Sequence, residues 1–313
     1  MTLRLVYRSY GGENFKRRPH YYSKLLTLTS FVQAAQQVPG AEVIFVNDGP
    51  IPADRLGIME RFGEVVQLAD QAKGMRASYR AALSMVKTRP WTDQDVVSYV
   101  EDDYLFTPDA LGYLLDAVVG LPEASYFSLY GKRPDYADPN VWVEHSLPRG
   151  WAAAPDVRVA GRIWYNRAGI ASTFAARVGV LRADLPIFRQ CMLPFRRRYL
   201  DHETCLIYQG FVPYHGKELL LGLPEDFTPS ARGVLRTIVL IPFRIALNLR
   251  ARRQREPHLL YTLTPNEATH LEHPVMSVDQ DWEAVAAQVA DWAEATGLAA
   301  PAASIRYSLA RTP

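Results

Sequence analysis

The sequence has few cysteines and no long apolar run. Its 313 residues include only Cys191 and Cys205, which form neither a Cys-x-x-Cys pair nor a disulfide framework. Two such thiols are typical of a reducing compartment, where they serve as small buried hydrophobic side chains. No stretch reaches the ~18 apolar residues that a membrane span needs, and residues 1–6 lack the apolar core of a signal peptide. These absences predict a cytoplasmic location.

An excess of charge of one sign is also lacking. Lys and Arg total 35 against 33 Asp and Glu, for a net charge of +2, whereas nucleic-acid-binding domains carry a clear basic excess. We therefore expect no nucleic-acid partner. Hydrophobic residues make up 48% and charged residues 22% of the chain, which is the balance of a globular protein with a substantial core. The length fits one large domain, or one domain with an appendage.

Short apolar runs alternate with amphipathic segments over the first 130 residues. Hydrophobic spacing predicts strands over residues 3–9, 42–46, 64–68, 95–100 and 125–130. It predicts helices over residues 21–38, 53–62, 73–86 and 108–119, the last with Thr107 as its N-cap. Such β-α alternation is typical of an α/β fold with a mostly parallel, Rossmann-like sheet and flanking helices.

Beyond residue 131 the pattern is less regular. It predicts a long loop over residues 131–157, a strand over 157–165 and mostly helix over 183–210. Residues 278–297 are predicted to form an amphipathic helix, with apolar residues at three-to-four spacing: Trp282, Val285, Val289 and Trp292. The Ala- and Pro-rich tail is expected to be loose. We therefore predict a C-terminal helical extension to the α/β core.

Polar residues follow three of the predicted strands, at the edge where ligands bind in sheets of this kind. These clusters are Arg8 to Glu13, Asn47-Asp48-Gly49 and Glu101-Asp102-Asp103. Three consecutive acids repel one another unless a cation or hydrogen-bond donors compensate their charge. Mg²⁺ and Mn²⁺ prefer carboxylate oxygens and often share them with substrate phosphates. The acids therefore predict a site for Mn²⁺ or Mg²⁺ bound together with a diphosphate.

The order and spacing of these motifs resemble the nucleotide-binding half of a GT-A fold glycosyltransferase of the family-2 type. The resemblance rests on the Asn-Asp-Gly turn at 47–49, on Lys-Gly-Met-Arg-Ala-Ser opening a helix at 73–78, and on Tyr-Val-Glu-Asp-Asp-Tyr at 99–104. It covers residues 1–130 well, is looser to about 215 and returns near 262–282. Glu101 departs from it, because the family usually has aspartate at that place.

The resemblance implies a metal-dependent transfer of a sugar from a nucleotide-sugar donor to a glycan or lipid-linked acceptor. Asp103, the last acid of the motif, would bind the metal ion, and His270 would complete the metal site. His273 and His215 are the other histidines considered for that position. The nucleotide donor would contact Arg8, Asp48, Gly74, Arg76, Ser78, Glu101 and Asp102.

An inverting transferase activates the acceptor hydroxyl with a carboxylate base. By the same resemblance the base lies near the start of a helix, where Asp201-His202-Glu203 is found, and either Asp201 or Glu203 could fill the role. The alternative is a helix N-terminus whose acids complement the helix dipole. A retaining enzyme needs no such base, and the sequence leaves both stereochemical outcomes open.

Arginines are concentrated at 196–198 and again over residues 244–255, directly after the apolar run 238–243. Basic and apolar residues together are typical of segments that lie on membrane surfaces, and Pro242 is expected to break a long helix there. This interpretation predicts peripheral association with the inner face of the membrane. The alternative is a solvated basic face.

These features divide the chain into three parts. Residues 1–230 would form the GT-A catalytic domain, 231–258 a segment that faces the membrane or the acceptor, and 259–313 an extension with the metal-site histidine and an amphipathic helix. Two other functions stay open. A nucleotidyltransferase builds a similar sheet around a metal-bound nucleotide, although the expected Gly-rich loop with a following Arg and Lys is missing after the first strand. A non-catalytic protein of the same fold would bind a nucleotide or glycan without turnover.

Overall fold

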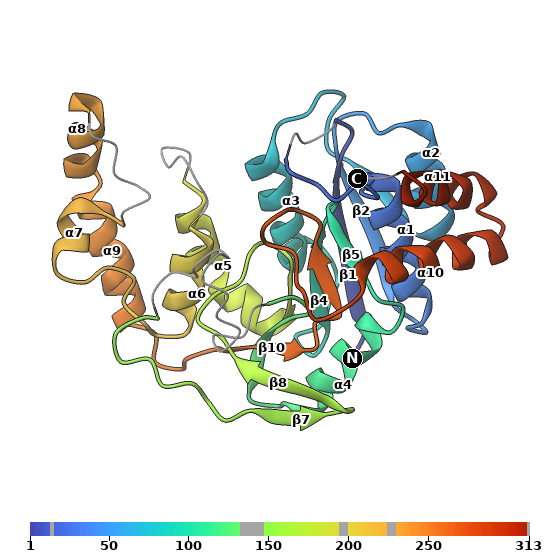
Figure 1. The fold of residues 1–313 in the computed structure, drawn as a ribbon. Coiled ribbons are helices and arrows are strands. Elements are labelled where there is room, and N and C mark those ends of the chain that lie inside the picture. The colour runs from blue at the N-terminus through green and yellow to red at the C-terminus, as the bar shows by residue number, and fades with distance from the viewer. Residues whose placement is uncertain (13–15, 132–146, 194–199, 224–229, 312–313) are drawn as a thin grey trace.

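The computed structural model describes residues 1–12, 16–131, 147–193, 200–223 and 230–311. Within these ranges the chain folds around a nine-stranded sheet in the order β3-β2-β1-β4-β9-β6-β10-β8-β7 (Figure 1). Its strands are β1 (Leu3–Tyr10), β2 (Glu42–Asp48), β3 (Glu64–Gln67), β4 (Val96–Glu101), β6 (Ala124–Ser128), β7 (Val157–Val159), β8 (Arg162–Asn166), β9 (Phe174–Arg177) and β10 (Leu259–Thr264). A separate two-stranded ladder joins β5 (Tyr104–Phe106) and β11 (Ala268–His270).

The N-terminal half of the sheet is parallel. β1 pairs with β2 and β4, and β2 pairs with β3. β9 then runs antiparallel between β4 and β6, while β10 is parallel to β6 and antiparallel to β8. The predicted α/β fold with a mostly parallel sheet is confirmed, and the sequence pattern missed the two central strands β9 and β10.

Helices cover both faces of the sheet (Figure 1). They are α1 (Lys24–Gln36), α2 (Ala53–Phe62), α3 (Met75–Thr88), α4 (Ala110–Gly120), α5 (Val178–Cys191), α6 (Asp201–Tyr208), α7 (Lys217–Leu221), α8 (Ala231–Val239), α9 (Ile241–Arg252), α10 (Trp282–Ala295) and α11 (Ala299–Leu309). The alternation along β1 explains the two layers, because successive side chains of a strand point to opposite faces. Leu5 and Tyr7 pack in the cluster that contains α1 and α4, whereas Val6 packs with α3, α5 and α6.

The C-terminal helical extension is confirmed, but the expectation of a loose tail is wrong. Trp282 and Val289 of α10 share a buried cluster with Leu26 of α1. Residues 299–309 form α11, and its Ile305 is buried in the same cluster. The tail is rich in alanine, the best helix former, and Pro301 lies in the first turn, where its missing N–H would have had no helical partner.

Two further local predictions are wrong. Thr107 is not an N-cap, because α4 begins at Ala110 and the Thr107 hydroxyl instead donates to the buried Glu267 carboxylate. Residues 157–165 form the hairpin of β7 and β8 rather than one strand, since the chain turns at Ala160 and Gly161, both with positive φ. The arginines at 196–198 and most of the loop predicted over 131–157 lie outside the described residues.

Pro242 breaks the basic segment as predicted. α8 ends at Val239 and α9 begins at Ile241, with Pro242 in its first turn. Arg244 does not belong to a solvated or membrane-facing surface, because it is buried and its Nη1 donates to the carbonyls of Leu219 (3.0 Å) and Leu220 (2.8 Å). Within the described residues, no helix combines the length and apolar character needed to cross a bilayer.

Asp95 anchors the start of β4 to the start of β1. Its buried carboxylate accepts hydrogen bonds from Arg4 Nη2 (2.8 Å) and from the N–H groups of Thr2 (2.8 Å) and Thr92 (3.0 Å). Burial alone would raise the pKa of Asp95, but these donors outweigh it and lower the pKa to about 2. A depressed pKa stabilises the fold above the ordinary carboxyl pKa, and this contribution is lost as the pH falls through about 4 toward 2.

We predict that Asp95→Asn lowers the free energy of unfolding by about 1 to 2 kcal/mol at pH 7. Urea unfolding at pH 7 and pH 3 measures this, and the deficit of the variant should shrink at the lower pH. Asp116→Asn, at an exposed position of α4, is the matched control and should change stability by less than about 0.5 kcal/mol. An equal deficit at both pH values would contradict the electrostatic explanation.

Candidate functional site

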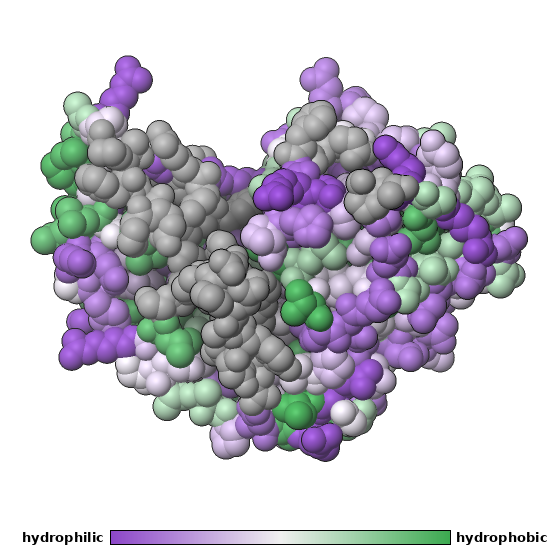
Figure 2. Space-filling view, in the orientation of Figure 1, coloured by the Kyte–Doolittle hydropathy of each residue, from purple (hydrophilic) through white to green (hydrophobic). Residues whose placement is uncertain are grey.

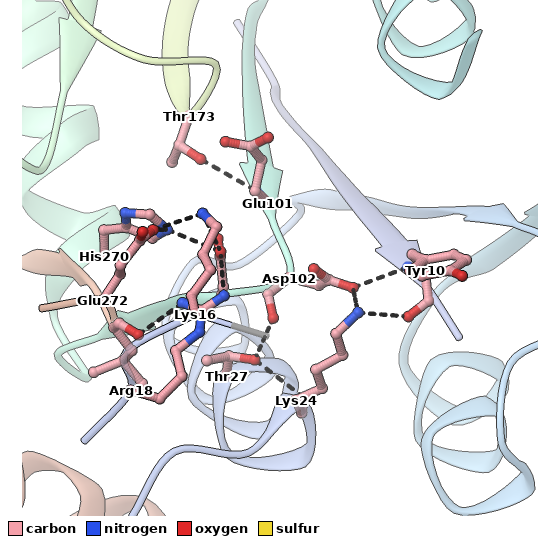
Figure 3. A network of polar contacts seen from close by, with 12 residues as sticks. Tyr10, Lys16, Arg18, Lys24, Thr27, Glu101, Asp102, Thr173, His270 and Glu272 are labelled. Carbon is pink, nitrogen blue, oxygen red and sulfur yellow. Dashed lines mark hydrogen bonds and ion pairs between the residues drawn. The ribbon is translucent and has the colours of Figure 1, made fainter. Parts of the chain in front are cut away.

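The three consecutive acids lie at the end of β4, and each has its own basic partner. Figure 3 shows Lys24 beside Asp102. Glu101 is the last residue of β4, and Asp102 and Asp103 connect it to β5. All three partners come from residues 8–24, in or after β1, which is the neighbour of β4 in the sheet. The repulsion expected from the sequence is therefore relieved by three separate ion pairs.

Arg8 partners Glu101. The two residues lie opposite each other in adjacent strands, and Arg8 Nη2 donates to Glu101 Oε1 at 2.7 Å. The guanidinium also lies over the ring of Tyr79 on α3, 4.7 Å from its centroid, which is a cation–π contact. Arg8 is only 5% exposed, so these contacts hold its charge at the carboxyl ends of β1 and β4. The fold thus brings together two of the predicted donor contacts.

The Asp102 side chain points toward Lys24 and Tyr10 and away from Glu101 (Figure 3). Its Oδ2 accepts hydrogen bonds from Lys24 Nζ (2.8 Å) and from the Tyr10 N–H (2.9 Å), and its carbonyl accepts one from Thr27 Oγ1 (2.9 Å). Lys24 is buried at the start of α1 and also donates to the Tyr10 carbonyl at 2.7 Å. Asp102 therefore joins β1 to α1, and its contact with the donor stays a prediction.

Asp103 contacts His270, which is the residue predicted to share its metal ion. Asp103 Oδ2 lies 2.8 Å from His270 Nε2 and 3.0 Å from Arg18 Nη2, and Arg18 Nη1 donates to the Leu271 carbonyl at 2.7 Å. Burial alone would raise the pKa of Asp103, but the bonds and charges of His270 and Arg18 lower it below its ordinary value. The carboxylate is therefore ionised at neutral pH, as a metal ligand has to be.

Lys16 and Glu272 border the same pair. Lys16 Nζ donates to Glu272 Oε2 at 2.6 Å and lies 3.9 Å from Asp103 Oδ2. His270 Nε2 is 3.4 Å from Glu272 Oε2, and its ring stacks on Tyr104 with the ring centroids 5.0 Å apart. The imidazole is thus fixed between an aromatic ring and two carboxylates.

The ladder of β5 and β11 positions His270. His270 pairs with Tyr104 in this ladder, and the Leu271 N–H donates to the Asp103 carbonyl at 3.0 Å. The turn before β11 is fixed by Glu267, whose buried carboxylate accepts hydrogen bonds from the Thr107 hydroxyl and from Arg162 Nε. Burial raises the pKa of Glu267 despite these donors. His270, far from Asp103 in the sequence, therefore reaches it through the ladder of β5 and β11.

Asp48 ends β2 and shapes the entry to α3. Its two carboxylate oxygens accept hydrogen bonds from the N–H groups of Lys73 (2.7 Å) and Gly74 (2.8 Å). Gly74 has a φ of 90°, a conformation that favours glycine. Ser78 lies one turn into α3, where its hydroxyl donates to the Met75 carbonyl at 3.1 Å. The structure thus gathers the predicted contacts Asp48, Gly74 and Ser78 around the N-terminus of α3.

Spare hydrogen-bonding groups lie at the same edge. Among the described residues, Arg8 Nε, Ser9 Oγ and both amide atoms of Asn47 are buried without a hydrogen-bond partner, whereas most buried polar groups have one. Arg76 adds a positive charge in the first turn of α3, and a helix N-terminus itself favours anions. The carboxyl ends of β1 and β2 therefore have the capacity to bind a polar, anionic ligand.

Asp201 and Glu203 begin α6, as predicted, but have different surroundings. Glu203 is 0% exposed and accepts a hydrogen bond from the Tyr214 hydroxyl at 2.9 Å. Asp201 is half-buried and lines a small pocket together with Tyr79. Tyr79 is the residue over which the Arg8 guanidinium lies, and burial and then the Asp201 charge raise its pKa. Asp201 is therefore the acid of this pair that faces the pocket next to Arg8.

Three basic residues of the site, Lys16, Arg18 and Lys24, were not predicted. Each resembles ordinary surface charge in a polar stretch, and the one signal is the basic run at 16–18 soon after the Gly-Gly pair that follows β1. Of the histidines considered, His270 contacts Asp103, whereas His273 is exposed and His215 precedes α7. The choice of His270 thus agrees with the geometry, and its role stays a prediction.

Asp103 and His270 offer an oxygen and a nitrogen ligand of the kind that Mn²⁺ and Mg²⁺ accept. In the part of the chain that the structure describes, no group of three or more His, Cys, Asp or Glu side chains is arranged as a metal centre. Such ions are commonly held by one or two carboxylates together with substrate phosphates. Two protein ligands therefore fit an ion that binds with a diphosphate, provided that Arg18 leaves Asp103 Oδ2.

No protein-family model and no curated protein matches the chain. Similar solved structures include S. aureus TarS 1-349, at a TM-score of 0.43 and 16% identity over 93% of this chain and 65% of that chain. Another is Mycobacterium tuberculosis glucosyl-3-phosphoglycerate synthase in complex with Mg²⁺ and UDP, at a TM-score of 0.34 and 11% identity over 57% of each chain. A third is 4-diphosphocytidyl-2C-methyl-D-erythritol synthase, at a TM-score of 0.37 and 12% identity over 76% of this chain and 98% of that chain.

The chain spans less than two thirds of the TarS structure that it matches. At these TM-scores the comparison carries no conclusion about this chain, and the α/β fold with a mostly parallel sheet rests on the strand order itself. Function therefore has to be argued from the residues of the site.

We predict that Arg18→Met raises the affinity of the chain for Mn²⁺ by about tenfold or more, because a unit charge about 5 Å from a dication costs over 1 kcal/mol even in water. Arg18 now lies on the carboxylate that the ion would bind. A Mn²⁺ titration followed by electron paramagnetic resonance measures the change.

Arg17→Met is the matched control, since Arg17 is exposed and adjacent in the chain. It should leave the affinity for Mn²⁺ within about twofold, a difference of about 0.4 kcal/mol. An unchanged or lower affinity in Arg18→Met would contradict the assignment of the ion to Asp103 and His270.

Proposed function

We propose that this chain is a glycosyltransferase that moves a sugar from a nucleotide-sugar donor to a hydroxyl of a glycan or lipid-linked acceptor. The observation that carries the proposal is the contact of Asp103 with His270 at the carboxyl end of β4. Ligands of open α/β sheets bind at that edge. Here the edge offers two metal-ligating side chains next to basic residues that suit a diphosphate.

The donor would lie along the carboxyl ends of β1, β2 and β4. Its diphosphate would lie between Asp103 and the N-terminus of α3, because that helix end favours anions. Asp48 and Gly74 shape the loop that would meet the base and ribose. Arg8 supports this placement, since its buried charge lies at the same edge.

Mn²⁺ or Mg²⁺ held by Asp103 and His270 would neutralise the charge that develops on the leaving nucleoside diphosphate. Arg18 and Lys16 occupy this position before the donor binds. On release from Asp103, both side chains would be free to contact the phosphates. Lys16 and Arg18 would therefore contact Asp103 in the absence of the donor and the phosphates in its presence.

We assign the role of general base to Asp201. Its carboxylate accepts the proton of the acceptor hydroxyl, and the hydroxyl oxygen attacks the anomeric carbon of the sugar. The bond from that carbon to the diphosphate oxygen breaks, and the nucleoside diphosphate leaves with the electron pair. This displacement inverts the anomeric centre. Glu203 is buried against Tyr214 and would position α6 without touching the substrate.

We predict that Asp201→Asn lowers kcat for release of nucleoside diphosphate by about 100-fold or more, the usual range for loss of a general base. The KM for the donor should stay within about threefold, because Asp201 acts on the acceptor. Glu203→Gln is the matched control, since it keeps a hydrogen-bond acceptor for Tyr214, and its kcat should fall much less. The assay measures nucleoside diphosphate released from each donor with sugar acceptors or water.

The same assay separates the other functions. Release of pyrophosphate in place of nucleoside diphosphate would indicate a nucleotidyltransferase. Donor binding without turnover, in the wild type and in Asp201→Asn alike, would indicate a non-catalytic binding protein. A larger loss of kcat in Glu203→Gln than in Asp201→Asn would move the base to Glu203.

A further inference from the structure

Helices α8 and α9 carry apolar side chains that stay exposed in the described part of the chain. Leu235, Ile238 and Val239 on α8 are 62%, 57% and 66% exposed, and Ile245 and Leu249 on α9 are 41% and 45% exposed. We call these five residues the apolar stripe, since spacings of three and four residues place the side chains of each helix on one face of that helix. Figure 2 shows hydrophobic residues along the left edge of the molecule, where Figure 1 places α8.

A buried arginine fixes the orientation of α8. The buried Arg244 of α9 donates through Nη1 to the carbonyls of Leu219 and Leu220, and through Nη2 to the Thr237 carbonyl at 3.2 Å. One side chain therefore joins α7, α8 and α9. Thr237 is the buried residue of α8, so the helix is anchored on its polar side and its apolar side takes little part in the core.

The same two helices are strongly basic. Residues 231–255 contain seven arginines and no aspartate or glutamate. Arg232 at the start of α8 and Arg252 and Arg253 at the end of α9 are exposed. The nearest acids along the chain are Glu225 and Asp226, which lie outside the described residues, and Glu256 beyond α9. The apolar stripe is thus bordered by positive charge at both ends.

We propose that the apolar stripe docks on an anionic membrane surface. Its apolar side chains would enter the headgroup region while the arginines contact lipid phosphates, the pattern of interfacial amphipathic helices. A second copy of this chain is a less suitable occupant, because a two-fold interface places the same surface against itself and would set the arginines of α8 and α9 against each other, with no acid within residues 231–255 to pair with them. This inference does not depend on the proposed sugar transfer.

Vesicle flotation with the whole chain tests the proposal. We expect binding to phosphatidylcholine vesicles that contain about a third anionic phosphatidylglycerol, weak binding to phosphatidylcholine alone, and release as salt is raised. Ile238→Asp should lower the partition coefficient about tenfold or more, because it removes a buried apolar side chain from the interface. Val278→Asp is the matched control, since Val278 is 84% exposed outside these helices, and it should bind as the wild type does.

A second pair of variants tests the electrostatic part. Arg252→Glu with Arg253→Glu should also weaken binding to anionic vesicles about tenfold or more, whereas Arg80→Glu, at an exposed position of α3, should not. Absence of binding to anionic vesicles, or equal losses in Ile238→Asp and Val278→Asp, would overturn the proposal. So would a dimer in light scattering that Ile238→Asp converts to a monomer, since the second copy would then be the occupant. Turnover of donor without vesicles should be unchanged in these variants, which separates failure of docking from failure of sugar transfer.

Discussion

Charge compensation at the end of β4 is the constraint on which the rest of the site depends. Three successive carboxylates are tolerated at the end of a buried strand because each meets a separate positive charge. Arg8, Lys24 and Arg18 supply these charges from one short segment in and after β1. The pairing also divides the motif by role: Asp102 fastens α1, while the acids on either side of it remain at the edge where a ligand would bind.

The sheet then assembles this edge from distant parts of the chain. Asp103 and His270 are 167 positions apart and meet because β11 pairs with β5. Asp201 lies at the start of α6 and lines a pocket together with Tyr79, whose ring contacts the Arg8 guanidinium. At a different surface, the buried Arg244 joins α7, α8 and α9 through hydrogen bonds to backbone carbonyls. These contacts fix the orientation of α8 and so the direction in which the apolar stripe faces. Both proposed binding surfaces are therefore held by ordered polar contacts.

The sequence predicted secondary structure best where the apolar residues of an element recur with the period of a helix or a strand. This holds for the strands and helices of the first 130 residues, and the pairing of Asp103 with His270 agrees with the resemblance that suggested it. The strands β9 and β10 were not predicted, because strands inside a sheet are covered on both faces and lose the alternation of apolar and polar residues. The ion pairs of Arg18 and Lys24 depend on how the segment after β1 folds back onto β4, which no local pattern encodes. The place of Asp201 at the start of a helix already favoured it slightly over Glu203, and the burial of Glu203 adds an observation that no local pattern gives.

The central claim is that the edge at Asp103 binds a nucleotide-sugar together with a divalent ion. Thermal unfolding of the purified chain with UDP-, GDP-, CMP- and dTDP-sugars, each with and without Mn²⁺, tests it most directly, because a ligand that binds only the folded state raises Tm. We predict that one nucleotide raises Tm, that Mn²⁺ increases the rise, and that Asp103→Asn abolishes the effect of Mn²⁺. No rise with any donor, or a Mn²⁺-dependent rise that Asp103→Asn retains, would contradict the claim.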